Sequence, residues 1–275
     1  MFGTILTIAR QELIINIRNK WTTIFSLVFG ILVIGISYFG TMAEGFAGIQ
    51  DFTRTSASIL NLVLYIVPLV ALTMGTLSFT GDKGSMELLF SQPISRTEIQ
   101  LGKLLGVFAS IAISTLIGFV GAGALIVNAS GIDGLARYSS FVALTLLLSI
   151  VFLCISMFIA TLSRRKSKAF GISLFLWFFF VLLYDLLAIG GALLLRGKSA
   201  NTFLFLSIFG NPVDMVRVAS LILLDNVSIF GAAGAALLRF VGGGTVGIAV
   251  LLGSLLMWII LPFLTMQRML KKQDM

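Results

Sequence analysis

The sequence predicts an all-α integral membrane protein with six transmembrane helices. Of its 275 residues, 58% are hydrophobic and 11% are charged, and the mean hydropathy is +1.09. A helix that crosses the hydrocarbon core of a bilayer needs about 20 mostly apolar residues. The charged residues leave five uncharged runs long enough for this, and we predict one membrane-spanning helix in each: residues 21–43, 55–81, 104–132, 138–163 and 240–267.

A sixth membrane-spanning helix is predicted over residues 169–195, which contain a single charged side chain, Asp185. A carboxylate within a span is costly and is by default a candidate for function. Two interpretations of Asp185 remain open. Either it ends the helix in a solvated or arginine-paired position, or it contributes to a gate or a substrate pathway.

The basic residues of the connecting segments predict the orientation of the chain. Thirteen Lys and Arg residues fall on the side that holds both termini, against six on the other side. Cytoplasmic segments carry the excess of basic residues, so we expect a cytoplasmic N-terminus and C-terminus. This distribution also accounts for the net charge of +8 without nucleic acid, and the basic cluster at residues 164–168 can attract anionic membrane lipid.

Residues 1–20 predict an amphipathic interfacial helix before the first span. Six apolar residues recur there at helical spacing: Phe2, Ile5, Leu6, Ala9, Leu13 and Ile17. Ile8, Ile14 and Ile15 fall off this stripe. The alternative is therefore a helix that is partly buried against other spans.

The segment between the second and third spans, residues 80–103, predicts a structured cytoplasmic docking surface. In this segment a carboxylate is followed by three apolar residues and then by a proline: Glu87, Leu88, Leu89, Phe90 and Pro93. A solvated loop needs only polar turn residues, so these side chains indicate contact with a soluble partner. Taken alone, Glu87 would be read as an exposed carboxylate. Ser95 and Glu98 follow at capping-box spacing, which predicts a helix that begins near Arg96.

The segment between the fifth and sixth spans, residues 196–239, is too apolar for a solvated loop and too interrupted for a spanning helix. We predict a re-entrant or surface-lying helical hairpin on the extracytoplasmic side. Asn211 before Pro212 is typical of a helix start, and this helix should extend to about Leu224. Asp214 and Arg217 lie one turn apart on it, as candidates for an outer gate or for contact with an outer partner.

The residue types of common catalytic and metal sites are scarce. Histidine is absent, and the one cysteine, Cys154, lies inside the fourth predicted span. We therefore expect neither a metal site nor a catalytic residue on this chain. The sequence also lacks a glycine-rich loop that ends in Gly-Lys-Ser or Gly-Lys-Thr. We expect no cofactor here, and any ATP hydrolysis has to come from a partner.

The loop pattern resembles that of one protein family. Residues 84–96 read GSMELLFSQPISR and residues 101–103 read LGK, which resembles the first cytoplasmic loop of type 2 ABC-exporter permeases. The resemblance covers essentially the whole chain and implies a single transmembrane permease domain over residues 1–275. It implies that Glu87 and its apolar neighbours form a coupling helix on a cytosolic ABC ATPase, with Arg96 positioning the turn.

The same resemblance implies further properties of the assembly. ATP and Mg would be bound by the ATPase subunit, and a second copy of the permease would complete the transporter. The chain would be a multi-pass protein of the prokaryotic plasma (inner) membrane.

Residues 209–217, FGNPVDMVR, resemble the Asn-Pro-x-Asp-x-x-Arg element of permeases from nitrous oxide reductase maturation systems. That resemblance implies an extracytoplasmic maturation protein as partner and a role in assembling a copper-sulfur centre. Two alternatives remain open: export of another cargo such as a drug, a lipid or sodium, and a non-transporting scaffold that the ATPase drives. A stand-alone ion-driven carrier is disfavoured because Asp185 is the main ionisable residue in the spans.

Overall fold

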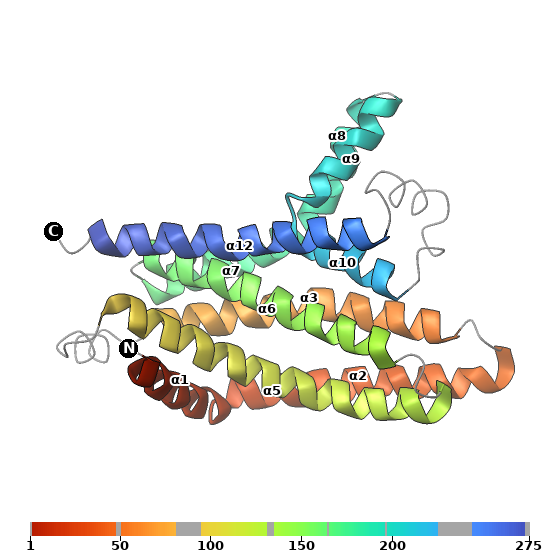
Figure 1. Ribbon diagram of the computed structural model, residues 1–275, viewed down its shortest axis with the longest axis horizontal. Helices are drawn as coiled ribbons and strands as arrows, with labels where there is room; N and C mark the ends of the chain where they lie inside the picture. The colour runs from red at the N-terminus through yellow and green to blue at the C-terminus, as the bar shows by residue number, and fades with distance from the viewer. Residues whose placement is uncertain are drawn as a thin grey trace.

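The structure, a computed structural model, describes residues 2–47, 51–80, 95–130, 135–163, 165–195, 197–224 and 244–272. Every regular element within these ranges is a helix (Figure 1). Six helical stretches in them are long and apolar enough to cross a membrane. The predicted all-α class is therefore confirmed for these ranges, and the six candidate spans agree with the predicted number.

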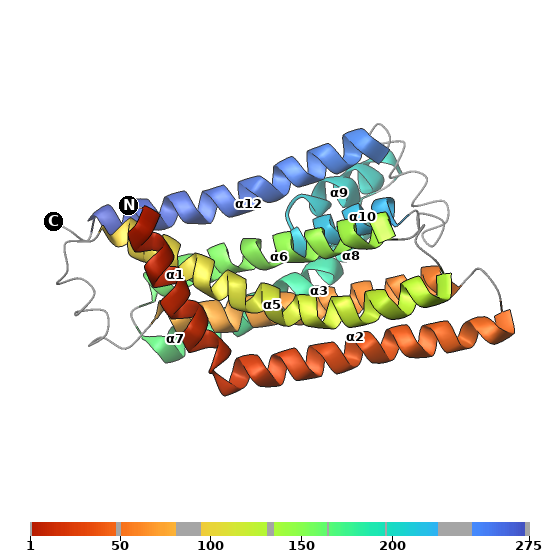
Figure 2. The same cartoon turned by 60° about the horizontal axis from the view of Figure 1, so that its bottom comes forward.

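Consecutive spans run in opposite directions along the bundle (Figure 1). They are formed by α2 (Lys20–Ala47), α3 (Asp51–Phe79), α5 (Arg96–Ser130), α6 (Leu135–Leu162), the stretch of α7 (Lys166–Phe178), η1 (Phe179–Leu183) and α8 (Tyr184–Leu194), and α12 (Gly244–Lys272). Helix α1 (Phe2–Ile17) lies at the same end of the bundle as the C-terminal turns of α12, the end of α3 and the start of α5 (Figures 1 and 2). We call this end of the bundle the terminal end.

Helix α6 forms the centre of the bundle, where it packs against α3, α5, α10 (Pro212–Leu223) and α12. In an 18-residue apolar stretch of α6, 67% of the residues are buried, against 17% in the corresponding stretch of the α7–α8 span and 17% in that of α12. The last two spans therefore turn most of their apolar surface outward. In a membrane protein such surface meets either lipid or another protein.

An aromatic cluster joins α2, α5 and α6 near the start of α6. Phe119 packs edge-on against Phe29, Tyr138 and Phe141, with ring centroids 5.5, 6.1 and 5.7 Å away. The hydroxyl of Tyr138 donates a hydrogen bond to the backbone oxygen of Phe119 at 2.8 Å. The cluster thus combines edge-to-face ring packing, which is the favoured geometry, with one polar contact between spans.

Tyr138→Phe is expected to lower the free energy of unfolding by about 0.6–1 kcal/mol, because one interhelical hydrogen bond is lost while the ring stays. Thermal unfolding of the purified protein in mild detergent measures the loss. Tyr65→Phe is the matched control, since the side chain of Tyr65 is exposed. Equal melting temperatures for the two variants would contradict a stabilising role of the Tyr138 hydroxyl.

Helix α1 crosses the start of α5 at the terminal end (Figure 2). Its buried residues are Ile8, Ala9, Glu12 and Asn16, whereas Leu6, which belongs to the predicted apolar stripe, is 71% exposed. The structure therefore agrees with the alternative of a helix packed against the spans. The remaining apolar face of α1 stays open to its surroundings.

The chain changes direction several times between the fifth and sixth spans. After the π-helical turn η1, helix α8 and helix α9 (Lys198–Ile208) form a hairpin that projects from the bundle (Figure 1). Gly197 lies between them with φ of +62°, in the left-handed region that glycine adopts most readily. Helices α9 and α10 then meet at 97°. Residues 225–239, the rest of the predicted hairpin segment, lie outside the described residues.

Candidate functional site

Asn211 starts α10 as the sequence predicts. Its side chain is fully buried, and its Oδ1 accepts a hydrogen bond from the backbone N–H of Val213 at 3.0 Å, with Pro212 in the first turn. Its Nδ2 donates to the backbone oxygen of Phe180 at 2.8 Å and to Asp214 Oδ2 at 2.8 Å. One amide thus caps α10, fixes Asp214 and ties both to the π-helical turn of the fifth span.

Arg217 completes this polar cluster by binding two carboxylates. Its Nη1 lies 2.7 Å from Asp214 Oδ1 and 3.0 Å from Asp185 Oδ2. The structure therefore pairs Asp185 with an arginine, although α8 continues beyond it to Leu194, and the ion pair joins α8 to α10. We call Asp185, Asn211, Asp214 and Arg217 the outer cluster.

Apart from Asp185, the outer cluster lies at the start of α10, in the bent pair of α9 and α10 that has the apolar character of a broken span or a re-entrant loop. The cluster has two carboxylates, and the described part of the chain contains no group of three His, Cys, Asp or Glu side chains that could hold a metal ion.

Asn211→Ala is expected to lower the free energy of unfolding by about 1–2 kcal/mol. It removes the cap of α10 and leaves the backbone oxygen of Phe180 without the donor that Asn211 supplies. The loss should appear as a lower melting temperature of the detergent-purified protein. Asn201→Ala provides the control, because Asn201 is exposed on α9, and a similar melting temperature for both variants would contradict the role of the Asn211 amide.

The predicted docking segment lies largely outside the described residues, which resume at Ser95. Glu87, Leu88, Leu89, Phe90 and Pro93 all belong to the undescribed part, and Arg96 is placed only as the first residue of α5. The capping box is confirmed, since the Ser95 N–H donates to Glu98 Oε2 at 3.2 Å and the Glu98 N–H donates to Ser95 Oγ at 3.3 Å. The helix that enters the third span therefore begins where the sequence predicts.

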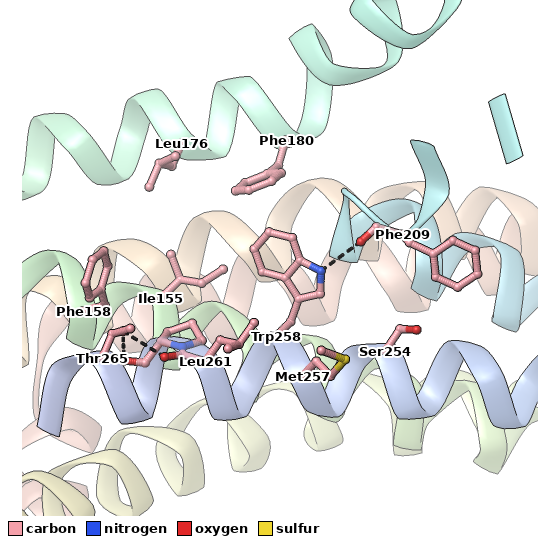
Figure 3. Close-up of a pocket in the computed structure, with 11 residues that line it drawn as sticks. Ile155, Phe158, Leu176, Phe180, Phe209, Ser254, Met257, Trp258, Leu261 and Thr265 are labelled. Atoms are coloured by element: carbon pink, nitrogen blue, oxygen red, sulfur yellow. Dashed lines mark hydrogen bonds between the residues drawn. The ribbon is translucent and has the colours of Figure 1, made fainter. Parts of the chain in front are cut away.

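A pocket of about 560 Å³ opens between α6, α7, η1 and α12 (Figure 3). Trp258 closes part of it, with its ring 5.6 Å from that of Phe180 and its Nε1 donating to the backbone oxygen of Phe209 at 3.2 Å. The two hydroxyls of its wall, Ser254 and Thr265, donate to backbone oxygens of α12 itself. The pocket is therefore suited to an apolar group rather than to an ion.

Comparison with known proteins gives a consistent result. Residues 6–275 match the family model described as ABC-2 family transporter protein. The chain is similar to the "Probable ABC transporter permease protein NosY" of Pseudomonas aeruginosa, with 36% identity over 235 residues that cover 83% of each chain. It is also similar to the protein of the same name from Stutzerimonas stutzeri, with 33% identity over 236 residues, which are 84% of this chain and 83% of the relative.

These matches confirm the resemblance that the loop at residues 84–103 suggests. The family match covers almost the whole chain, and both relatives align with most of it. The six apolar helices are those expected of a multi-pass membrane protein. The chain therefore belongs to the ABC-2 family of transporter proteins and is a membrane permease of that family.

Proposed function

We propose that this chain is the permease subunit of an ATP-driven ABC transporter, in which a separate cytosolic subunit binds ATP and Mg and hydrolyses the ATP. The family match over residues 6–275 carries this proposal. The sequence has no phosphate-binding loop of its own, so an ATPase partner has to supply the chemistry. The segment with Glu87, Leu88, Leu89, Phe90, Pro93 and Arg96 is the proposed contact with that partner.

The proposed transporter lies in the inner membrane of a prokaryote, with both termini of the permease in the cytoplasm. The basic residues on the side of the termini support this orientation. In this orientation the terminal end carries the docking segment, and the outer cluster faces the extracytoplasmic side. Two copies of the chain, each a single permease domain, would form the membrane part of the transporter.

The proposed biological role is maturation of the copper-sulfur centre of nitrous oxide reductase, through export of a sulfur species or through work on an extracytoplasmic maturation protein. The resemblance of residues 209–217 and the similarity to two proteins named NosY support this role. The outer cluster is proposed to shape the surface that the maturation protein contacts, because Asn211 is itself fully buried and the hydrogen bonds and ion pair of the cluster hold η1, α8 and α10 together.

Affinity purification of the tagged chain from native membranes in mild detergent, followed by mass spectrometry, tests the proposal. An ABC ATPase together with an exported copper-enzyme maturation protein is the expected result. Recovery of the ATPase alone would retain the permease and reject the specific role in nitrous oxide reductase maturation. Absence of any ATPase, under conditions that preserve other membrane complexes, would overturn the proposed function as a whole.

A further inference from the structure

Glu12 is a buried acidic residue in the middle of α1. It is 9% exposed, and its Oε1 accepts hydrogen bonds from Ser78 Oγ at 2.5 Å and from Asn16 Nδ2 at 3.0 Å. A carboxylate taken out of water is strongly unfavourable unless hydrogen bonds compensate it. The contact with Ser78 therefore fixes α1 to the last turn of α3.

Lys103 binds the same residue of α3 from the other side. It is 8% exposed, and its Nζ donates to the backbone oxygen of Ser78 at 3.1 Å. The last carbonyls of a helix lack partners within the helix and carry partial negative charge, so a buried lysine is well placed there. Ser78 thus links an acidic residue of α1 to a basic residue of α5.

The contact between α1 and α5 is direct as well, because two glycines of α5 admit the backbone of α1. A Cβ atom added at Gly106 would lie 2.6 Å from the backbone oxygen of Ala9 and 2.6 Å from Glu12 Cβ. A Cβ atom at Gly102 would lie 2.7 Å from Ile8 Cβ. These neighbours belong to the backbone or lie next to it, so α1 cannot adjust to a side chain at either position without moving.

The three helices meet where the docking segment joins the end of α3 and the start of α5. We call these two helix ends the stems of the docking segment. Ser78 lies one residue before the end of α3 at Phe79, and Lys103 lies in the second turn of α5, which begins at Arg96. Residues 81–94 connect these stems. Any force applied to that segment therefore reaches the spans through α3 and α5, where α1 contacts both.

We propose that Glu12 is a positioning residue that holds the two stems together through Ser78 and Lys103, so that α1, α3 and α5 respond as one unit to the ATPase. The inference rests on the proposed function, because it assumes that the ATPase acts on residues 81–94. It assigns α1 a role in transmission and leaves the docking contact itself to the loop. A purely stabilising cluster would instead affect folding alone.

Three variants separate these roles in the purified complex of permease and ATPase. Glu12→Ala removes both hydrogen bonds accepted by the side chain, whereas Glu12→Gln keeps an oxygen in place to accept them. Gln11→Ala is the control, because Gln11 is exposed on the same helix. The measurements are the amount of ATPase that copurifies, the permease-dependent rate of ATP hydrolysis, and hydrogen exchange of the permease backbone.

Glu12→Ala is expected to copurify with as much ATPase as the wild type while permease-dependent hydrolysis falls about tenfold, a typical coupling between distant sites. Hydrogen exchange should increase in α1 and near Ser78 only. Glu12→Gln and Gln11→Ala should retain hydrolysis within about threefold of the wild-type rate. Gly106→Ala, which keeps Glu12 but displaces α1, should reproduce the loss seen in Glu12→Ala.

Three results would overturn the inference. They are wild-type hydrolysis in Glu12→Ala, loss of the ATPase from a Glu12→Ala protein that remains folded, and a Glu12→Gln variant as impaired as Glu12→Ala. Failure of the proposed function looks different, because the wild-type chain would then bring down no ATPase. The copurification measurement therefore distinguishes the two failures.

Discussion

Replacement of Glu87 by arginine is expected to abolish permease-dependent ATP hydrolysis while the protein still inserts into the membrane. The proposed ATPase contact places this carboxylate among Leu88, Leu89 and Phe90. Loss of one member of a hydrogen-bonded charge pair at an interface costs about 2–5 kcal/mol, and juxtaposed like charges add to that cost. Affinity for the ATPase should therefore fall by at least about 30-fold.

Titration of the purified permease with its ATPase, with binding and hydrolysis measured in parallel, tests this expectation. Glu44→Arg is the matched control, because it makes the same charge change near the C-terminal end of α2. That end of α2 lies far along the bundle from the terminal end. Leu88→Lys and Leu89→Lys should resemble Glu87→Arg, since they bring a charge into the apolar part of the contact. Normal stimulation of the ATPase by Glu87→Arg would rule out the coupling role of this loop.

Features that depend on neighbouring residues were predictable from the sequence. The Ser95–Glu98 capping box and the Asn211 cap before Pro212 both form as expected. Each is decided by side chains within three residues of one another. The number of spans was predictable for a similar reason, because a run of about 20 apolar residues satisfies the bilayer whatever the rest of the chain does.

Contacts between helices were harder to predict because apolar residues of a membrane helix face lipid as well as protein. The pattern of apolar residues therefore does not identify the buried face. In α1 the predicted stripe includes Leu6, which is exposed, and omits Ile8, which is buried. The buried face also includes Glu12, whose partner Ser78 is 66 residues away in the chain.

The outer cluster illustrates both cases. The pairing of Asp214 with Arg217 follows from their separation by one helical turn. The second pairing, between Arg217 and Asp185, joins residues 32 positions apart, and it depends on how α8 and α10 are placed after the π-helical turn. The uniformly apolar residues of η1 gave no local signal for that turn.

Arg217→Ala is expected to lower the free energy of unfolding by about 2–3 kcal/mol. Removing one partner of a fully buried ion pair costs about 3–5 kcal/mol because the remaining charge is unpaired. The side chains of Arg217 and Asp185 are 23% and 36% exposed, so water compensates part of this loss. Thermal and denaturant unfolding in detergent measure the change. The stability of Arg217→Lys should fall between that of the wild type and that of Arg217→Ala, because a single ammonium group cannot present a guanidinium fork.

Asp185, the second carboxylate bound by Arg217, allows a test of the ion pair itself. Asp185→Asn alone should destabilise the protein, because it removes a partner of Arg217. Added to Arg217→Ala, the same substitution should instead restore part of the lost stability, because it removes one of the two carboxylates left unpaired. Additive losses in the double variant would contradict the bridging role of Arg217. Arg217→Ala should also weaken recovery of the proposed extracytoplasmic partner, because the loss of the ion pair loosens the packing of α8 against α10. The ATPase should copurify as before, and its loss would contradict this division between the two ends of the bundle.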